Sequence, residues 1–243
     1  MGLKESGLRG SLRSVSTEVG AIPDNVTNHW PMNEGSGSSV ADNIGDETVS
    51  LNGASWLSDS KYEGGFATTY QDGDHWITDN PIDIRSQEQT VCVWIDDCTI
   101  PNNTFPQIVG TGQTNQGIVA GGWYVGFESD NTDSYAVQHG DSSGSTTNAL
   151  RDVSGPDAST EDVFLAYSLD GETGNLFLYD NNGLVNSEIG QSERSTEGET
   201  ELLGMMRDNG SRSVSGNVDT PFLSVDTALP QSDIDDIWNA TRR

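Results

Sequence analysis

The chain has 243 residues, and its composition excludes several classes of protein before any motif is considered. It carries 38 acidic against 11 basic residues, a formal net charge of −27, which argues against nucleic acid as a partner because phosphate backbones are bound through cationic groups. Six Trp, six Tyr and six Phe in regular apolar runs argue against an acidic disordered chain, and no run approaches the ~18 apolar residues of a membrane span.

The first 26 residues differ from the rest of the sequence, because their local charge is close to neutral and leucines recur at helical spacing. We expect them to form an anchoring and assembly arm that becomes ordered against another molecule; a frayed terminus is the alternative. The segment has no apolar core of an export signal, so the protein is expected to reach the exterior within a particle or after removal of a leader. The expected contact residues of the arm are Lys4, Leu8, Arg9, Leu12 and Arg13.

From residue 27 onward the sequence predicts an all-β domain. Short apolar or aromatic runs alternate with clusters of Gly, Asn, Asp and Ser, and 28 glycines indicate many turns. The clearest hairpin joins two alternating strands, 163–169 and 175–180, across the DGETG turn at 170–174. A short helix is expected to close the chain at 231–240, with Ile234, Ile237 and Trp238 on one face.

The segment TVCVWID at 90–96 predicts a central strand, because both of its alternating faces are apolar. Val93 lies on one face and Trp94 on the other. Six residues of extended chain separate Cys92 from Cys98 by about 20 Å, which is too far for a disulfide unless the chain doubles back. We therefore expect two free thiols, at least one of them buried.

Several of these runs resemble, in the same order, those of laminin-G-like and concanavalin-A-like domains. The similarity covers about residues 27–243 and is carried by HWPMNEGSG at 29–37 with VAD at 40–42, GASW at 53–56 with 61–66, QDGDHWI at 71–77, TVCVWI at 90–95, AYSLDG at 166–171 with 176–180, and the closing 226–234. The resemblance implies an antiparallel two-sheet jelly-roll sandwich, with the N-terminal arm before it and the short helix at its end. It is specific for the fold and much less so for a ligand.

Catalysis is not expected. Glycoside hydrolases of this architecture place two or three carboxylates at alternate positions of one strand. Glu128 and Asp130 come closest to that pattern, but they lie at a strand end and indicate a turn. The three histidines form no Ser-His-Asp order with a nucleophile elbow. A glycan hydrolase is therefore the least favoured function.

A structural calcium ion is the cofactor that the resemblance suggests. Many relatives hold one ion where the first turn meets the last strands, and the matching residues here are Glu34, Asp42 and Asp219. Calcium needs several oxygen ligands of this kind. The sequence after Asp42 departs from the family's usual pattern, and carboxylates merely solvated on an acidic surface are the alternative.

Sugar recognition requires exposed aromatic rings beside Asn and Asp groups that bind hydroxyls. Trp123 and Tyr124 are neighbours on one expected strand, so one of them should face away from the core if the strand is half-buried. His75, Trp76 and Trp94 are further candidates. Core packing is the alternative for all of them, and it is the expectation for Trp30, Trp56 and Trp238.

Only two of the eleven cationic residues are lysines, and an acidic, lysine-poor composition of this kind favours a halophile. Self-repulsion is screened at about 1 M salt, where the Debye length is about 3 Å. These features favour a virion structural protein of a haloarchaeal virus: a capsid turret, decoration protein or tail fibre on the virion's extracellular surface. The opening GLKESGLRG at 2–10 also resembles laminin-G-like proteins encoded near structural genes of such viruses.

The expected partners are other copies of the chain in a trimer or pentamer, other virion proteins, and a host-surface glycan or S-layer glycoprotein. The alternative function is a secreted or cell-surface carbohydrate-binding module of a halophilic archaeon.

Overall fold

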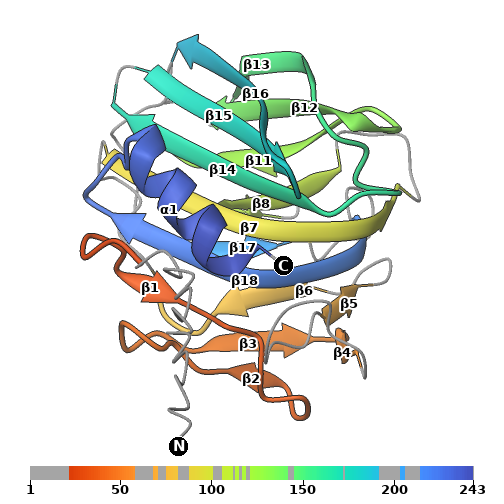
Figure 1. The fold of residues 1–243 in the computed structure, drawn as a ribbon, viewed down its shortest axis with the longest axis vertical. Helices are drawn as coiled ribbons and strands as arrows, with labels where there is room; N and C mark the ends of the chain where they lie inside the picture. The colour runs from red at the N-terminus through yellow and green to blue at the C-terminus, as the bar shows by residue number, and fades with distance from the viewer. Residues whose placement is uncertain are drawn as a thin grey trace, which may run out of the picture.

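The computed structural model describes residues 22–57, 68–70, 75–81, 88–100, 106–111, 113–114, 117–118, 121–141, 145–171, 173–191, 203–205 and 214–242. In these ranges the chain forms two antiparallel sheets packed face to face, with a helix on the outer face of one sheet (Figure 1). The predicted fold class, an antiparallel sandwich with a C-terminal helix, is confirmed. Residues 1–21, which include every named contact of the predicted arm, lie outside the described residues.

The first sheet, sheet A, has the strand order β16-β15-β14-β7-β18-β5-β4, and β1 also pairs with β18. Its strands are β1 (Asn28–His29), β4 (Ser55–Trp56), β5 (Thr68–Tyr70), β7 (Glu88–Thr99), β14 (Val163–Asp170), β15 (Thr173–Asp180), β16 (Gly183–Gln191) and β18 (Ser215–Val225). The predicted hairpin is confirmed as β14 and β15, with Phe164 opposite Tyr179 and Leu169 opposite Gly174. The strand predicted at 90–96 is the middle of β7, which pairs with β14 on one side and β18 on the other.

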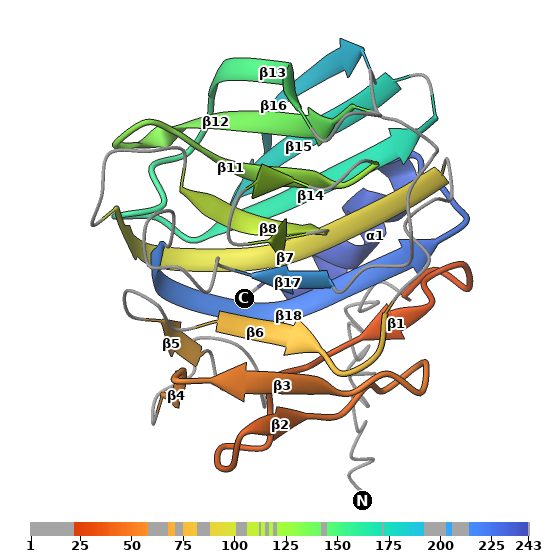
Figure 2. The same ribbon diagram turned by 180° about the vertical axis from the view of Figure 1, so that it is seen from behind.

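The second sheet, sheet B, has the order β13-β12-β11-β8-β17-β6-β3-β2 and faces the viewer in Figure 2. Its strands are β2 (Ser39–Val40), β3 (Val49–Asn52), β6 (His75–Thr78), β8 (Gln107–Thr111), β11 (Trp123–Glu128), β12 (Asn131–Gly140), β13 (Thr146–Ser154) and β17 (Leu203–Met205). A separate two-stranded pair is formed by β9 (Gln113–Thr114) and β10 (Gly117–Ile118). All strand pairs named here are antiparallel, as the resemblance implied.

Alternation along β7 divides the apolar residues into two clusters. Val91, Val93 and Ile95 point into the core between the sheets, whereas Cys92 and Trp94 belong to a second cluster on the outer face of sheet A. Each fully buried side chain of this size stabilises the fold by roughly 1.5–3 kcal/mol. The prediction of a central strand with two apolar faces is therefore confirmed.

The second cluster exists because α1 (Gln231–Thr241) covers the outer face of sheet A. Ile234, Ile237 and Trp238 face the sheet, as the helical spacing predicted. The indole Nε1 of Trp94 donates to Thr241 Oγ1 at 2.8 Å, which ties the last turn of the helix to β7. No helix in the described part of the chain is long and apolar enough to cross a membrane.

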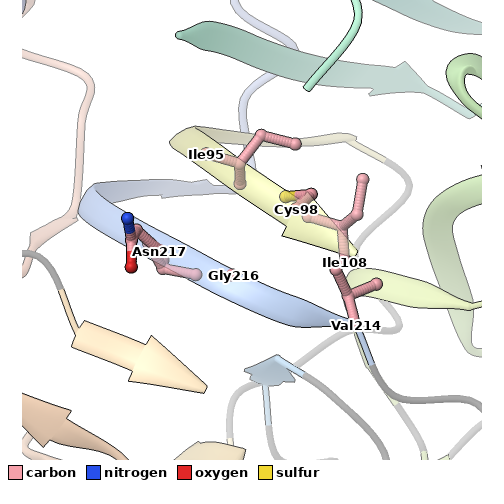
Figure 3. A pocket seen from close by; sticks show the side chains of 7 residues that line it. Ile95, Cys98, Ile108, Val214, Gly216 and Asn217 are labelled. Atoms are coloured by element: carbon pink, nitrogen blue, oxygen red, sulfur yellow. The ribbon is translucent and has the colours of Figure 1, made fainter. Parts of the chain in front are cut away.

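Both cysteines are free and buried, as predicted. Burial raises the pKa of each thiol, and Asp96 adds to the effect at Cys98. The side chains around Cys98 shown in Figure 3, among them Ile95, Ile108 and Val214, enclose a packing gap without room for a water molecule. These thiols are therefore structural and the gap is not a ligand cavity.

Candidate ligand-binding hollow

Trp123 belongs to the core between the sheets. Its side chain is 1% exposed, its Nε1 donates to Gln89 Oε1 at 2.9 Å, and its ring centroid lies 5.5 Å from that of Tyr167. The ring therefore has no free face on which a sugar could stack.

Tyr124, the next residue on β11, faces the outer side of sheet B. Its hydroxyl donates to Gln138 Oε1 on β12, and Gln138 Nε2 donates to Asn148 Oδ1 on β13 at 2.8 Å. These three side chains form a polar row across three strands. One of the two aromatic side chains, that of Tyr124, does point away from the core between the sheets, as expected. The expectation that it is exposed to solvent is wrong, because Tyr124 is also only 1% exposed.

The other aromatic candidates are likewise used for packing. Trp76 is fully buried between the sheets beside Trp30, with ring centroids 5.9 Å apart. Trp94 is fully buried under α1. His75 lies on β6 opposite Asn52, and its side chain is outside the described part of the structure. The expectation of an exposed ring is therefore wrong for Trp76 and Trp94.

The three predicted calcium ligands have separate roles. Asp42 accepts hydrogen bonds from the backbone N–H groups of His29, Ile44 and Gly45 and from the Asn28 amide, which fixes the first turn against β1. Glu34 accepts from the Ala41 N–H at 2.8 Å, and Asp219 is buried on β18. Among the described residues, no three His, Cys, Asp or Glu side chains gather in a way that would hold a metal ion. The calcium site stays a prediction.

Glu128, the carboxylate that comes closest to a catalytic pattern in the sequence, is held in an ion pair. Arg151 on β13 contacts both carboxylate oxygens of Glu128, with Nε to Oε2 at 3.0 Å. Asp130 lies in the exposed β11–β12 turn, where Ser129 adopts a φ of 60°. A carboxylate engaged on two oxygens by a guanidinium is poorly placed to serve as an acid or nucleophile.

A polar hollow of about 300 Å³ opens at one end of the sandwich, where the segment before β14 meets the β15–β16 turn. It is lined by hydroxyl, amide and carboxylate groups: Thr160, Glu161, Asp162, Asp180, Asn181 and Asn182. Asn181 Nδ2 donates to Asp162 Oδ2 at 3.2 Å and so links the two walls. The indole Nε1 of Trp238 donates to the Asp180 carbonyl at 3.0 Å, which fixes the hollow to α1.

Asp180 organises the turn on which the hollow depends. Its carboxylate accepts from the backbone N–H groups of Asn182 and Gly183 at 2.6 and 3.0 Å, and from Asn182 Nδ2 at 3.0 Å. Burial opposes ionisation of Asp180, but these hydrogen bonds outweigh it and lower its pKa below the usual value. The group is therefore anionic at neutral pH.

The chemistry of the hollow suits a ligand rich in hydroxyl groups. Amides and a threonine hydroxyl can donate and accept hydrogen bonds, and carboxylates accept them from sugar hydroxyls. Three carboxylates also make the hollow strongly negative, which disfavours an acidic ligand. Sequence reasoning missed these residues because Asn and Asp next to Gly indicate a turn, and a turn needs no ligand to explain it.

The comparisons with known proteins identify the fold. No protein-family model matches the sequence, and a search of curated proteins finds no match. Solved structures do match, among them the binding domain of Paraclostridial Mosquitocidal Protein 1, with 12% identity, a TM-score of 0.64, and coverage of 90% of this chain and 53% of that one. The chain shares its fold with toxin binding domains.

Two further structures show the same sandwich. The binding domain of botulinum neurotoxin DC in complex with SialylT has 13% identity and a TM-score of 0.60, over 90% of this chain and 52% of that one. The Trypanosoma rangeli sialidase in complex with 2,3-difluorosialic acid has 13% identity and a TM-score of 0.61, over 90% of this chain and 34% of that one. The chain thus spans about half the length of the toxin domains and about a third of the sialidase. At these identities the likeness concerns the fold alone.

Proposed function

We propose that the sandwich is a non-catalytic adhesion module that binds a surface glycan or glycosylated receptor through the polar hollow. The observation that carries the proposal is the fold shared with toxin binding domains, one of them in complex with SialylT. The hollow supports the proposal, because its lining residues can hydrogen-bond sugar hydroxyls and are not part of the hydrophobic core.

The ligand that fits the hollow is neutral rather than acidic. Glu161, Asp162 and Asp180 line it. A sialylated glycan would bring its own carboxylate into contact with these three, at distances where even molar salt does not fully screen the repulsion. Without a stacking ring, a single hollow should bind weakly, with a Kd on the order of 1 mM, so several copies acting together would give firm adhesion.

A glycan array probed with the full chain in about 2–3 M salt tests the proposal, because charge repulsion between copies is screened there. We expect binding to neutral glycans, and a loss of about tenfold or more in affinity for Asn181→Ala and for Asp162→Asn, corresponding to about 1.4 kcal/mol. Asn80→Ala is the matched control, since Asn80 Nδ2 also donates to a carboxylate, Glu47 Oε2 at 3.1 Å, but outside the hollow. Equal binding by all variants, or binding to sialylated glycans alone, would contradict the assignment.

The proposed carrier of the module is the exterior of a haloarchaeal virus, as a turret, decoration protein or tail fibre. The acidic, lysine-poor composition supports an environment of molar salt. Mass spectrometry of purified virions is the test, and the expected result is recovery of the chain with the particles. Recovery from the cell envelope or medium alone would favour the secreted carbohydrate-binding module instead.

A further inference from the structure

Exposed large apolar side chains gather on one strand. Ile44, Leu184, Val185 and Ile189 are the four in the described part of the chain, and the last three lie on β16, with exposed fractions of 39%, 51% and 68%. Within the described part of the chain, β16 ends the strand order of sheet A and is paired with β15 alone. Natural edge strands are protected from pairing by Lys, Pro, bulges or inward-facing charges. β16 has no Lys or Pro; it carries one bulge at Val185 and one inward-facing charge, Glu188, and is regular from Asn186 onward.

The two faces of β16 differ in what covers them. On the inner face, Asn186 Nδ2 donates to the Ser154 carbonyl of β13 at 2.7 Å, and a Cβ at Gly190 would meet the Ala149 carbonyl at 2.4 Å. On the outer face, Ser187 lies opposite Phe177, which belongs to the cluster under α1. The helix does not extend over Ile189, which is the most exposed of the large apolar residues described. An apolar surface therefore remains open along the outer face of β16.

We propose that two copies of this chain pair antiparallel through β16 and join their A sheets across a two-fold axis at Ser187. This register places Val185, the extra residue of the β15–β16 bulge, opposite Ile189 of the partner subunit, twice by symmetry, and Asn186 opposite Glu188 of the partner subunit. The neighbouring registers are worse. An axis at Glu188 sets two carboxylates opposite each other, and an axis at Asn186 sets Val185 opposite Ser187 of the partner subunit and so removes the apolar pairing.

Two acidic copies of the chain repel each other, and the repulsion is weakest where they meet along β16. Each copy carries −27, whereas β16 contributes a single charged residue, Glu188. The contact is apolar while the surrounding charges repel, so pairing should strengthen as salt screens that repulsion. An interface built on ion pairs would weaken instead. The dimer does not depend on the proposed glycan function, although Asn182 immediately precedes β16, so pairing would set two hollows on one continuous sheet.

Light scattering after size-exclusion chromatography of the full chain in about 2–3 M salt, over a range of protein concentration, tests the pairing. The expected result is a dimer that becomes monomeric in Ile189→Lys while circular dichroism stays unchanged. Ile44→Lys is the matched control, because Ile44 is 45% exposed at a turn outside β16, and it should remain dimeric. A monomer at every concentration, or a trimer or pentamer unaffected by Ile189→Lys, would overturn the proposal.

A cross-linking experiment tests the register independently of affinity. Ser187→Cys should form a disulfide-linked dimer under mild oxidation, because facing residues on antiparallel strands are about 4.5–5.5 Å apart at Cα, within disulfide reach. Cys92 and Cys98 are buried and do not compete. Ser36→Cys, exposed at a turn outside β16, should stay unlinked. Equal linking of the two variants, or none in Ser187→Cys, would overturn the register.

Discussion

The outer face of sheet A and the polar hollow are built from different residue types and differ in what the fold requires of them. Under α1, the ring of Phe164 packs tilted against Trp94 and edge to face against Tyr179, with centroids 5.2 and 5.6 Å apart, so these rings are occupied by packing. At the hollow, Asp162 and Asn181 are tied to each other and half-buried or exposed, and the core does not need them. Among the described residues, aromatic side chains build the fold, and the turn residues at the hollow are the ones that we propose for binding.

The largest loss of stability is expected when an aromatic ring is removed from the face of sheet A that α1 covers. Trp94→Ala should lower the free energy of unfolding by about 3–5 kcal/mol, because it leaves a cavity between β7 and α1 and removes the hydrogen bond to Thr241. Chemical denaturation in molar salt measures it. A change below about 1 kcal/mol would show that the cluster does not hold the fold.

The next largest effect is a dependence of the stability on pH, caused by His29 at the margin of the same cluster. His29 stacks on Phe222 with centroids 4.1 Å apart, and burial lowers its pKa from 6.5 to about 4, against the raising effect of Asp42. The unfolded chain therefore binds more protons between pH 4 and 6.5, so stability is fully present above pH 6.5 and falls as pH drops towards 4.

The loss should be at most about 3 kcal/mol, since one pKa unit corresponds to about 1.4 kcal/mol. Unfolding curves at pH 7.5 and 4.5 measure it. His29→Phe keeps a ring on Phe222 and should remove most of this slope; an unchanged slope would assign the pH dependence to other groups.

A smaller effect is expected at the polar row on sheet B. Tyr124→Phe removes the hydroxyl that donates to Gln138 and should cost about 1–2 kcal/mol of stability, because Gln138 is buried. Glycan binding should stay unchanged. Lost binding with intact stability would break the comparison, since it would place the ligand on the outer face of sheet B.

The smallest expected change in stability is at the hollow. Asn181→Ala should alter the free energy of unfolding by less than about 0.5 kcal/mol, because the side chain is exposed and its single hydrogen bond lies at the surface. Denaturation beside the wild-type chain measures it. A loss above about 1 kcal/mol would mean that Asn181 holds the fold, and its effect on binding would then be indirect.

Much of the fold could be predicted because its signals are local. Alternation in 90–96, the turn at 170–174 and the helical spacing of Ile234 and Ile237 each depend on neighbours in the sequence, and the structure confirms all three. Exposure is not local. Tyr124 faces outward as alternation allows, yet it is buried within a sheet whose other strands, carrying Gln138 and Asn148, lie up to 24 residues away in the sequence.

The hollow could have been found from one further step. The β14–β15 register that places Phe164 opposite Tyr179 also brings Asp162 to the level of Asn181, at the open end of a hairpin that the sequence predicts. The contact of Trp238 with the Asp180 carbonyl could not be predicted from the sequence, because it depends on how α1 folds back across the sheet. A turn signal alone could not show that two such segments enclose a space.

Hydrogen–deuterium exchange of the full chain, with and without the neutral glycan that binds best on the array, tests the central claim most directly. The account predicts slower exchange confined to peptides that cover 160–162 and 180–183, and no change in β11 and β12. Protection along β11 and β12 without any at the hollow would contradict it, and would place recognition on the outer face of sheet B.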